Sequence, residues 1–286
     1  MMNKILYFIA LCAFCGLGSA RAQSAPAASA RVAGQIVAAR VQGHVAVLSK
    51  AGLENRLLHD GDQVSEQATI VTSPEASVIL VFSNGAAVIV AGDSRLDISE
   101  FEQDPFSGAL KVSDMKQEPG TSLTRLNLTR GELTARVAHL NVDKGSEFTI
   151  QTPVGAAGIR GTFLRVIFRP GKDHKAQFSV QTFEGLVLFT GLTSGPVNIP
   201  AGRKFEATFE YNPKNVDNPA GWHAPSSLTL EGGLLSPAEV AKFQSELQAI
   251  LAALADIVFP PYTGENEPPP PAPPLNPPTP GAGSGS

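Results

Sequence analysis

The chain has 286 residues, of which 43% are hydrophobic and 17% are charged, and its formal net charge is −4 at pH 7. This weak negative charge argues against a nucleic-acid-binding protein, which would need a strongly basic face. Once the two end segments described below are set aside, about 235 residues remain, enough to bury a hydrophobic core in one large or two small domains.

The N-terminus has the features of a signal peptide. Lys4 supplies a positive charge, residues 5–18 form an apolar stretch, and Ala20-Arg21-Ala22 places small residues on either side of a cleavage point before Gln23. We expect residues 1–22 to be removed during export to the periplasm or the cell exterior, and residues 23–34 to form a linker. No later stretch has the roughly 20 apolar residues of a transmembrane helix, so we expect no transmembrane span.

Both cysteines fall within this leader. Leu11 and Phe14 precede Cys12 and Cys15, whereas a lipoprotein signal requires a small residue at that position, so we expect no lipid anchor. The processed chain would then contain no cysteine, and neither a disulfide nor thiol chemistry could contribute to it.

Residues 35–210 consist mainly of short β-rich runs separated by glycine-containing turns. Asn84-Gly85 between two apolar runs is the strongest hairpin signal, and Arg130-Gly131-Glu132 is expected to turn the chain between two further strands. Strands recurring at this spacing predict an all-β fold, as a β-sandwich, a jelly-roll or a short β-solenoid, in which sheet packs against sheet. The charge-rich residues 100–122 are expected to leave the sheet as a surface excursion.

Residues 211–235 are expected to form a connector and residues 236–259 an amphipathic α-helix. Ser236, Pro237 and Glu239 supply the N-cap, the first-turn proline and the glutamate of a capping box. The apolar stripe of this helix consists of Val240, Phe243, Leu247, Ile250, Leu254 and Ile257. We expect the stripe to pack on the β-domain; the alternative is self-association of two chains through the same six residues.

The C-terminal residues 260–286 are dominated by proline, glycine and serine. Such a composition cannot bury a core, so we expect a disordered tail.

The sequence shows no constellation of catalytic or metal-binding residues. The five histidines have no spacing typical of a metal site; they are His44, His59, His139, His174 and His223. The segment Gly155-Ala156-Ala157-Gly158 lacks the Lys-Ser/Thr of a phosphate-binding loop and leads into a strand instead of a helix. We therefore expect no enzymatic activity, no cofactor and no metal.

The most informative segment is 148–163, which joins an alternating strand to a glycine-rich turn closed by Arg160-Gly161-Thr162. It resembles the signature of FecR-domain proteins. The resemblance continues through residues 58–64, 70–76, 80–85, 183–187 and 199–202, and so covers most of residues 40–207. It implies a FecR-like β-domain over residues 35–210.

The best-known members of the FecR family are transmembrane regulators that pass an iron-siderophore signal to a sigma factor, and many others are exported proteins of unassigned role. Because only Met1 to Lys4 precede the apolar run, we do not expect a cytoplasmic segment that could hold a sigma factor. Our leading interpretation is a non-enzymatic, exported FecR-domain protein that scaffolds or binds an envelope protein or polysaccharide. The alternative is a periplasmic ligand-sensing subunit related to iron-transport regulators, and a carbohydrate-active enzyme ranks third.

The resemblance marks Gly155, Gly158, Arg160, Gly161 and Thr162 as candidate binding residues. Two interpretations stay open for Arg160: its five N–H donors could brace loop carbonyls, or they could contact an anion or a sugar hydroxyl of a ligand. The glycines around it favour the brace, because they indicate a constrained backbone.

The first testable prediction concerns processing. The exported protein should begin at or near Gln23, because the small residues at Ala20 and Ala22 suit signal peptidase. Intact-mass spectrometry of the exported protein checks this, and an acylated N-terminus at Cys12 or Cys15 would contradict it.

Overall fold

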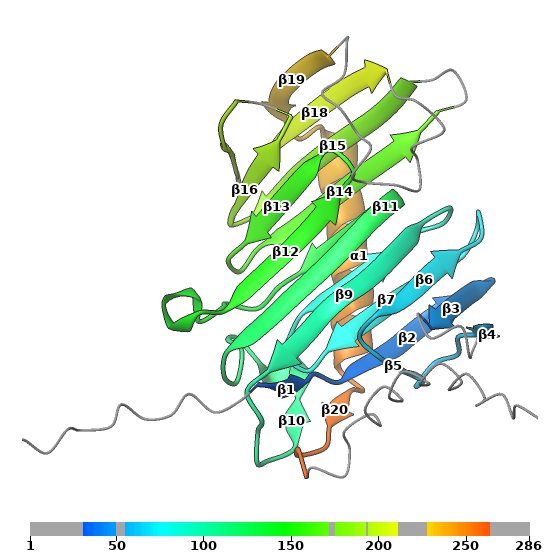
Figure 1. Ribbon diagram of the computed structural model, residues 1–286, viewed down its shortest axis with the longest axis vertical. Helices are drawn as coiled ribbons and strands as arrows, with labels where there is room; N and C mark the ends of the chain where they lie inside the picture. Colours follow the sequence, from blue (N-terminus) through cyan, green and yellow to red (C-terminus); the bar gives the residue numbers. More distant parts are fainter. Residues whose placement is uncertain (1–30, 50–54, 172–174, 193, 211–227, 264–286) are drawn as a thin grey trace, which may run out of the picture. The chain divides into compact units, whose positions relative to one another are not determined.

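The computed structural model describes residues 31–49, 55–171, 175–192, 194–210 and 228–263. The expected signal peptide, most of the expected linker and connector, and nearly all of the expected tail lie outside these ranges. Within them the chain forms β-strands and one α-helix, as the sequence predicts (Figure 1).

The strands form two extended sheets, here called sheet A and sheet B. Sheet A has the order β4 (Asn55–Leu57), β3 (Val45–Ser49), β6 (Ala68–Thr72), β9 (Arg95–Gln103), the first part of β11 (Ser122–Arg136), β12 (Glu147–Thr152), β13 (Gly155–Ile159), β16 (Leu186–Gly191) and β17 (Val197–Pro200). The short strand β1 (Val32–Ala33) pairs with the end of β9. All pairings in sheet A are antiparallel except β11 with β12, which is parallel.

Sheet B has the order β5 (Gln63–Val64), β2 (Ile36–Gln42), β7 (Ser77–Phe82), β8 (Ala87–Val90), the second part of β11, β14 (Phe163–Pro170), β15 (Lys175–Glu184), β18 (Arg203–Glu210) and β19 (Leu228–Leu234). Its pairings are all antiparallel. The strand β19 lies in the segment that the sequence assigns to a connector, so the sheet extends beyond residue 210.

Strand β11 is shared by both sheets. The sequence led us to expect a turn at residues 130–132; instead the strand is continuous, and Gly131 marks the place where it leaves sheet A and enters sheet B. Gly131 has φ +101°, and a Cβ there would lie 2.1 Å from Ser94 Oγ. The Ser94 hydroxyl also accepts a hydrogen bond from the Glu132 backbone N–H at 3.0 Å. This close contact requires glycine and ties the crossing strand to the turn between β8 and β9.

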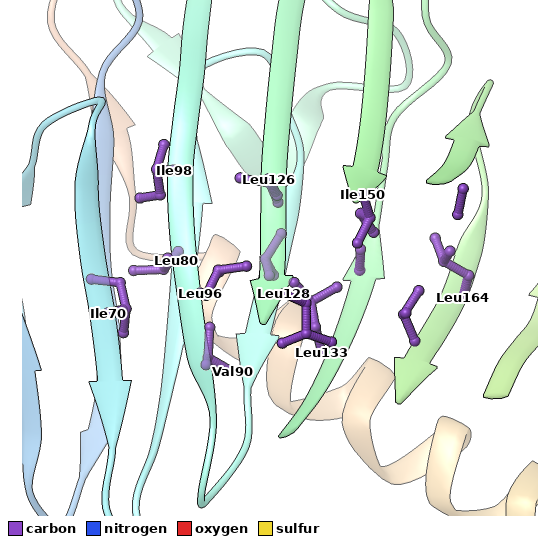
Figure 2. Packing of buried hydrophobic residues seen from close by; sticks show 14 of the residues in the cluster. Ile70, Leu80, Val90, Leu96, Ile98, Leu126, Leu128, Leu133, Ile150 and Leu164 are labelled. Carbon is purple, nitrogen blue, oxygen red and sulfur yellow. The ribbon is translucent and has the colours of Figure 1, made fainter. Parts of the chain in front are cut away.

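The two sheets enclose the main hydrophobic core. Alternate residues along each strand point inward, as the period of two predicts. Figure 2 shows side chains of both sheets meeting there; those from sheet A include Ile70, Leu96, Ile98, Leu126 and Ile150, and those from sheet B include Leu80, Val90, Leu133 and Leu164. Each of these nine residues is 0% exposed, so the predicted packing of sheet against sheet is confirmed.

Helix α1 (Pro237–Leu254) covers part of the outer face of sheet B and lies behind the sheets in Figure 1. Its buried residues Phe243, Ile250 and Leu254 pack in a second apolar cluster with Val81 and Phe163 of the sheet. The predicted capping box at Ser236 is present, with Glu239 N–H donating to Ser236 Oγ and Ser236 N–H to Glu239 Oε2. Three of the six stripe residues are buried against the sheet of the same chain, which is the packing that the sequence favoured over self-association.

The helix is shorter than residues 236–259. It ends at Leu254, and Val258–Phe259 form strand β20, which pairs with β10 (Leu110–Lys111). The segment between β9 and β11 is therefore not a free excursion: residues 100–103 belong to β9, and β10 and the 3₁₀ turn Val112–Asp114 pack against the end of the helix. Burial of Phe259 and Val112 supplies the reason, since both are at most 2% exposed.

A buried ion-pair network also holds α1 on sheet B. Arg165 of β14 is 2% exposed, and its guanidinium lies 3.2 Å from Glu132 of β11 and 2.5 Å from Glu246 of α1. The same group donates to Gln181 at 3.0 Å and lies 4.3 Å from the centroid of the Phe243 ring. A guanidinium can be buried only when carboxylates and other acceptors replace its water, so α1 completes the environment of Arg165.

The network continues to the N-terminus of the helix. Glu239 Oε1 accepts hydrogen bonds from Gln181 and from Lys204, each at 3.0 Å. Burial raises the pKa of Glu239, but hydrogen bonds from Ser236 and Lys204 outweigh that effect, and the pKa lies below its usual value. Its ionised form is thus favoured in the folded state, and this contribution to stability is lost as the pH falls through the lowered pKa.

We predict that Arg165→Met lowers the free energy of unfolding by about 3–5 kcal/mol, because it leaves the buried Glu132 with weaker partners and removes the contact to Glu246. Urea denaturation measures the loss. Lys242→Met is the matched control: Lys242 also pairs with Glu132, but its side chain is 50% exposed, so the cost should stay below about 1 kcal/mol. Equal costs for the two variants would contradict the role of the buried guanidinium.

Candidate functional site

The motif strand β13 lies in sheet A between β12 and β16. Its residues alternate: Ala157 and Ile159 are buried in the core between the sheets, whereas Ala156 and Gly158 lie on the outer face. The only α-helix among the described residues covers sheet B, so it does not cover this face of sheet A.

Three of the five candidate residues have structural roles. Gly161 has φ +98°, and a Cβ there would lie 3.2 Å from His139 Cα. Thr162 donates its hydroxyl to the Leu186 carbonyl at 3.2 Å, and its own carbonyl accepts from Val137 N–H at 3.0 Å. Gly155 has φ +155°, and a Cβ there would lie 2.3 Å from the Thr190 carbonyl oxygen. These residues let the turns on both sides of β13 pack tightly.

Gly158 is different, because nothing in the backbone requires a glycine there. Its φ is not positive, and the nearest atom to an added Cβ is the Leu188 carbonyl oxygen at 3.6 Å, an ordinary contact. A side chain would fit into the strand and project from the outer face of sheet A. What glycine provides at this position is open space on that face.

Arg160 follows on the same face at the end of β13. Its side chain is exposed and makes no hydrogen bond or ion pair with any residue in the described part of the chain. The structure therefore does not contain the brace between Arg160 and loop carbonyls that the sequence favoured. The turn is held instead by Gly161 and Thr162, and the guanidinium remains available to a ligand.

A groove of about 370 Å³ lies over Gly158 on the outer face of sheet A. It brings together residues from four strands and a preceding loop: Val142, Ser146, Glu147, Phe148, Thr149, Gly158, Ile159, Arg160, Leu186, Leu188 and Asn198. Leu186 and Leu188 are 47% and 38% exposed, which is unusual for leucines side by side on one strand. The volume lies within the range of ligand pockets in proteins.

The groove is lined by both apolar and polar residues. Leu186, Leu188 and Val142 supply apolar surface, whereas Thr149 and Asn198 supply side-chain hydrogen-bonding groups. Glu147 already accepts a hydrogen bond from Thr149 at 3.0 Å and lies 3.7 Å from Arg125. Of the two charged lining residues, Arg160 is thus the one with unused donors, and it suits a carboxylate or another anion.

Sequence reasoning identified Gly158 and Arg160 but missed the leucines. The run Leu186-Val187-Leu188-Phe189 is apolar at every position, which is typical of a strand buried on both faces. Only the arrangement of the sheets shows that one face of this strand is open. The exposed pair is therefore visible in the fold and not in the local pattern.

No group of three or more His, Cys, Asp or Glu side chains within the described ranges is placed to hold a metal ion. In the same part of the chain, no helix combines the length and apolar character needed to cross a membrane.

Residues 68–188 match the family model described as FecR protein. The chain carries a FecR domain. The match runs from β6 to β16 and includes the whole of β13, so the groove is built mainly from the FecR domain; Asn198 of β17 lies outside it.

Two crystal structures, at 2.50 Å and 1.65 Å resolution, show similarity to the chain. Both come from Parabacteroides distasonis and are provisionally described as an anti-sigma factor. Each is 10% identical in sequence and covers 62% of this chain, with TM-scores of 0.40 and 0.41. The alignments cover 63% and 64% of those chains, just under two thirds of their length. No curated protein sequence matches the chain significantly.

Gly161, which has a structural role, and Gly158, which leaves open space, should respond differently to substitution by valine. Gly161→Val should lower the free energy of unfolding by about 1–3 kcal/mol, because valine is strained at positive φ and the added atoms meet His139. Gly158→Val should change stability by less than about 0.5 kcal/mol, since β-branched residues suit exposed strand positions. Thermal unfolding of both variants checks the difference, and equal destabilisation would refute the assignment of Gly158 as open space.

Proposed function

We propose that this protein is a non-catalytic, regulatory FecR-domain protein of the bacterial cell envelope that acts by binding a partner protein through the groove on sheet A. The observation that carries the proposal is the unpaired Arg160 beside two exposed leucines, over a glycine that keeps the surface open. We propose a periplasmic or secreted location on the basis of the signal-peptide features of residues 1–22 and the FecR match.

The makeup of the groove supports binding over catalysis. Burial of apolar surface on Leu186 and Leu188 would supply affinity at roughly 25 cal/mol per Å². A charge-assisted hydrogen bond from Arg160 would fix the orientation of the bound group. This combination suits an extended protein segment that carries an apolar side chain next to a carboxylate.

A protein partner fits the groove better than a polysaccharide. Sugar-binding sites commonly stack aromatic rings against the sugar, and the one aromatic residue that lines this groove, Phe148, is 1% exposed and faces the core. Exposed leucines, by contrast, are typical of protein interfaces when they occur as a patch.

A regulatory role is favoured over a purely structural scaffold by the FecR domain itself. The helix α1 covers part of the outer face of sheet B, whereas the outer face of sheet A presents the strand that contains the family motif. A protein that reports on a bound partner needs such an open recognition face on a rigid scaffold.

The proposed function can be tested by affinity capture from envelope extract with three forms of the protein as bait. Gly158→Lys fills the groove and brings a second cation beside Arg160. Ala156→Lys adds the same side chain to the same face two residues away, where it lies outside the groove. We expect a specific partner to be retained by the wild type and by Ala156→Lys, and its recovery to fall at least about tenfold with Gly158→Lys, a loss of about 1.4 kcal/mol in binding.

Quantitative mass spectrometry of the captured proteins gives the result, and circular dichroism confirms that both variants are folded. The same set of captured proteins from all three baits would reject the groove as the binding site. Loss of the partner with both variants would show that the outer face of sheet A contributes to binding but that the groove is not the specific binding site.

A further inference from the structure

Strand β19 forms an open edge of sheet B. It pairs with β18 on one side, and no register among the described residues joins its second side to another strand; in Figure 1 it lies at the top, beyond β18. It has seven residues, whereas the other terminal strands of the two sheets, β4, β5 and β17, have three, two and four. Natural sheets usually protect an edge by keeping it short or by adding lysine or proline, and β19 has neither residue.

The register identifies which backbone groups of β19 are free. Leu235 N–H donates to the Gly202 carbonyl at 2.9 Å, and the register continues through Gly233 opposite Lys204 and Glu231 opposite Glu206. Alternate residues of an antiparallel strand direct their N–H and C=O groups to opposite sides. The odd-numbered residues therefore bond to β18, and Leu230, Gly232 and Leu234 direct theirs away from the sheet.

The same three residues share one face of the strand. Leu230 lies opposite Ala207 and Gly232 opposite Phe205, and both of those β18 residues belong to the core between the sheets. Leu230 and Leu234 are nevertheless 41% and 70% exposed, because no strand continues the sheet beyond them within the described residues. A Cβ at Gly232 would meet nothing within 4 Å.

We propose that this edge is an interface with a second copy of the chain, in which the two β19 strands pair antiparallel about a two-fold axis at Gly232. In this register Leu230 of each chain lies opposite Leu234 of the partner subunit. Gly232 lies opposite its counterpart, so all three pairs use the backbone groups that are free. The paired strands join the two B sheets and bury both leucine pairs from solvent.

Charge favours this arrangement over a two-fold axis at Glu231. A two-fold axis at Glu231 would also use the free backbone groups, but it would place two carboxylates face to face. An axis at Gly232 instead places Glu231 opposite Gly233 of the partner subunit. The Lys204 side chain lies over Gly233, with its Cε 3.7 Å from the position of an added Cβ, so each Glu231 arrives beside a lysine of the other chain.

This interface is separate from the groove on sheet A, and the two can be tested independently. Gly158→Lys should leave the oligomeric state unchanged, and variants of β19 should leave the groove open. The pairing also differs from self-association through the stripe of α1, which is buried against sheet B.

Analytical ultracentrifugation of the full chain, isolated as the cell processes it, tests the proposal. We expect a concentration-dependent dimer for the wild type. Gly232→Pro removes an N–H that β18 does not use and places a ring at the free edge, so it should weaken dimerisation at least about tenfold with an unchanged melting temperature. Gly232→Ala is the matched control, because it keeps the N–H, and it should dimerise like the wild type.

Leu230→Lys is a second variant that does not depend on how proline is tolerated, and it should likewise yield monomers by placing two lysines next to the shared apolar surface. Either variant that folds and stays fully dimeric overturns the proposal. A wild-type protein that stays monomeric over an about hundredfold range of concentration also overturns the proposal. This holds even if β19 then binds a foreign peptide.

Discussion

The burial of Arg165 is the interaction on which the arrangement of this protein depends. A guanidinium in the middle of a sheet face cannot stay without acceptors, and Glu132 on the neighbouring strand supplies only part of them. Gln181 of β15 accepts from it as well, Glu246 of α1 adds a second carboxylate, and Phe243 covers the guanidinium with its ring. The ionic contacts fix where the helix lies, and the apolar cluster around Phe163 and Ile250 provides most of the area that holds it there.

This docking makes the two outer faces of the body unequal. The part of the outer face of sheet B under α1 belongs to a second core, whereas the outer face of sheet A carries the FecR motif strand and meets solvent. The residues of the motif accordingly have two kinds of role. Gly155 and Gly161 serve the turns, where positive φ and close contacts leave no room for a side chain. Gly158 and Arg160 shape the groove, one by leaving space and the other by offering an unpaired cation.

Much of the fold could be predicted from local pattern. The all-β class, the hairpin at Asn84-Gly85 and the capping box at Ser236 follow from alternation, turn chemistry and capping residues, which act over a few positions. The Asn84 side chain has a further role that only the structure shows: it is buried and donates to Ser122 and Thr124 of β11. Arg130-Gly131-Glu132 was misread as a turn because a glycine at positive φ bends a continuous strand as readily as it ends one.

The sequence by itself determined most of the elements, the FecR resemblance and two residues of the groove, because periodicity, caps and motif spacing are properties of neighbouring residues. Only the tertiary structure decided which faces are covered. The partners of Arg165 come from positions 132 and 246, and the groove joins leucines at 186 and 188 to a glycine at 158. Contacts between residues so far apart depend on how strands are ordered and on which face the helix packs. That order is set by the summed free energy of the whole core. No local segment contributes enough to this sum for the order of the strands to be predicted from that segment alone.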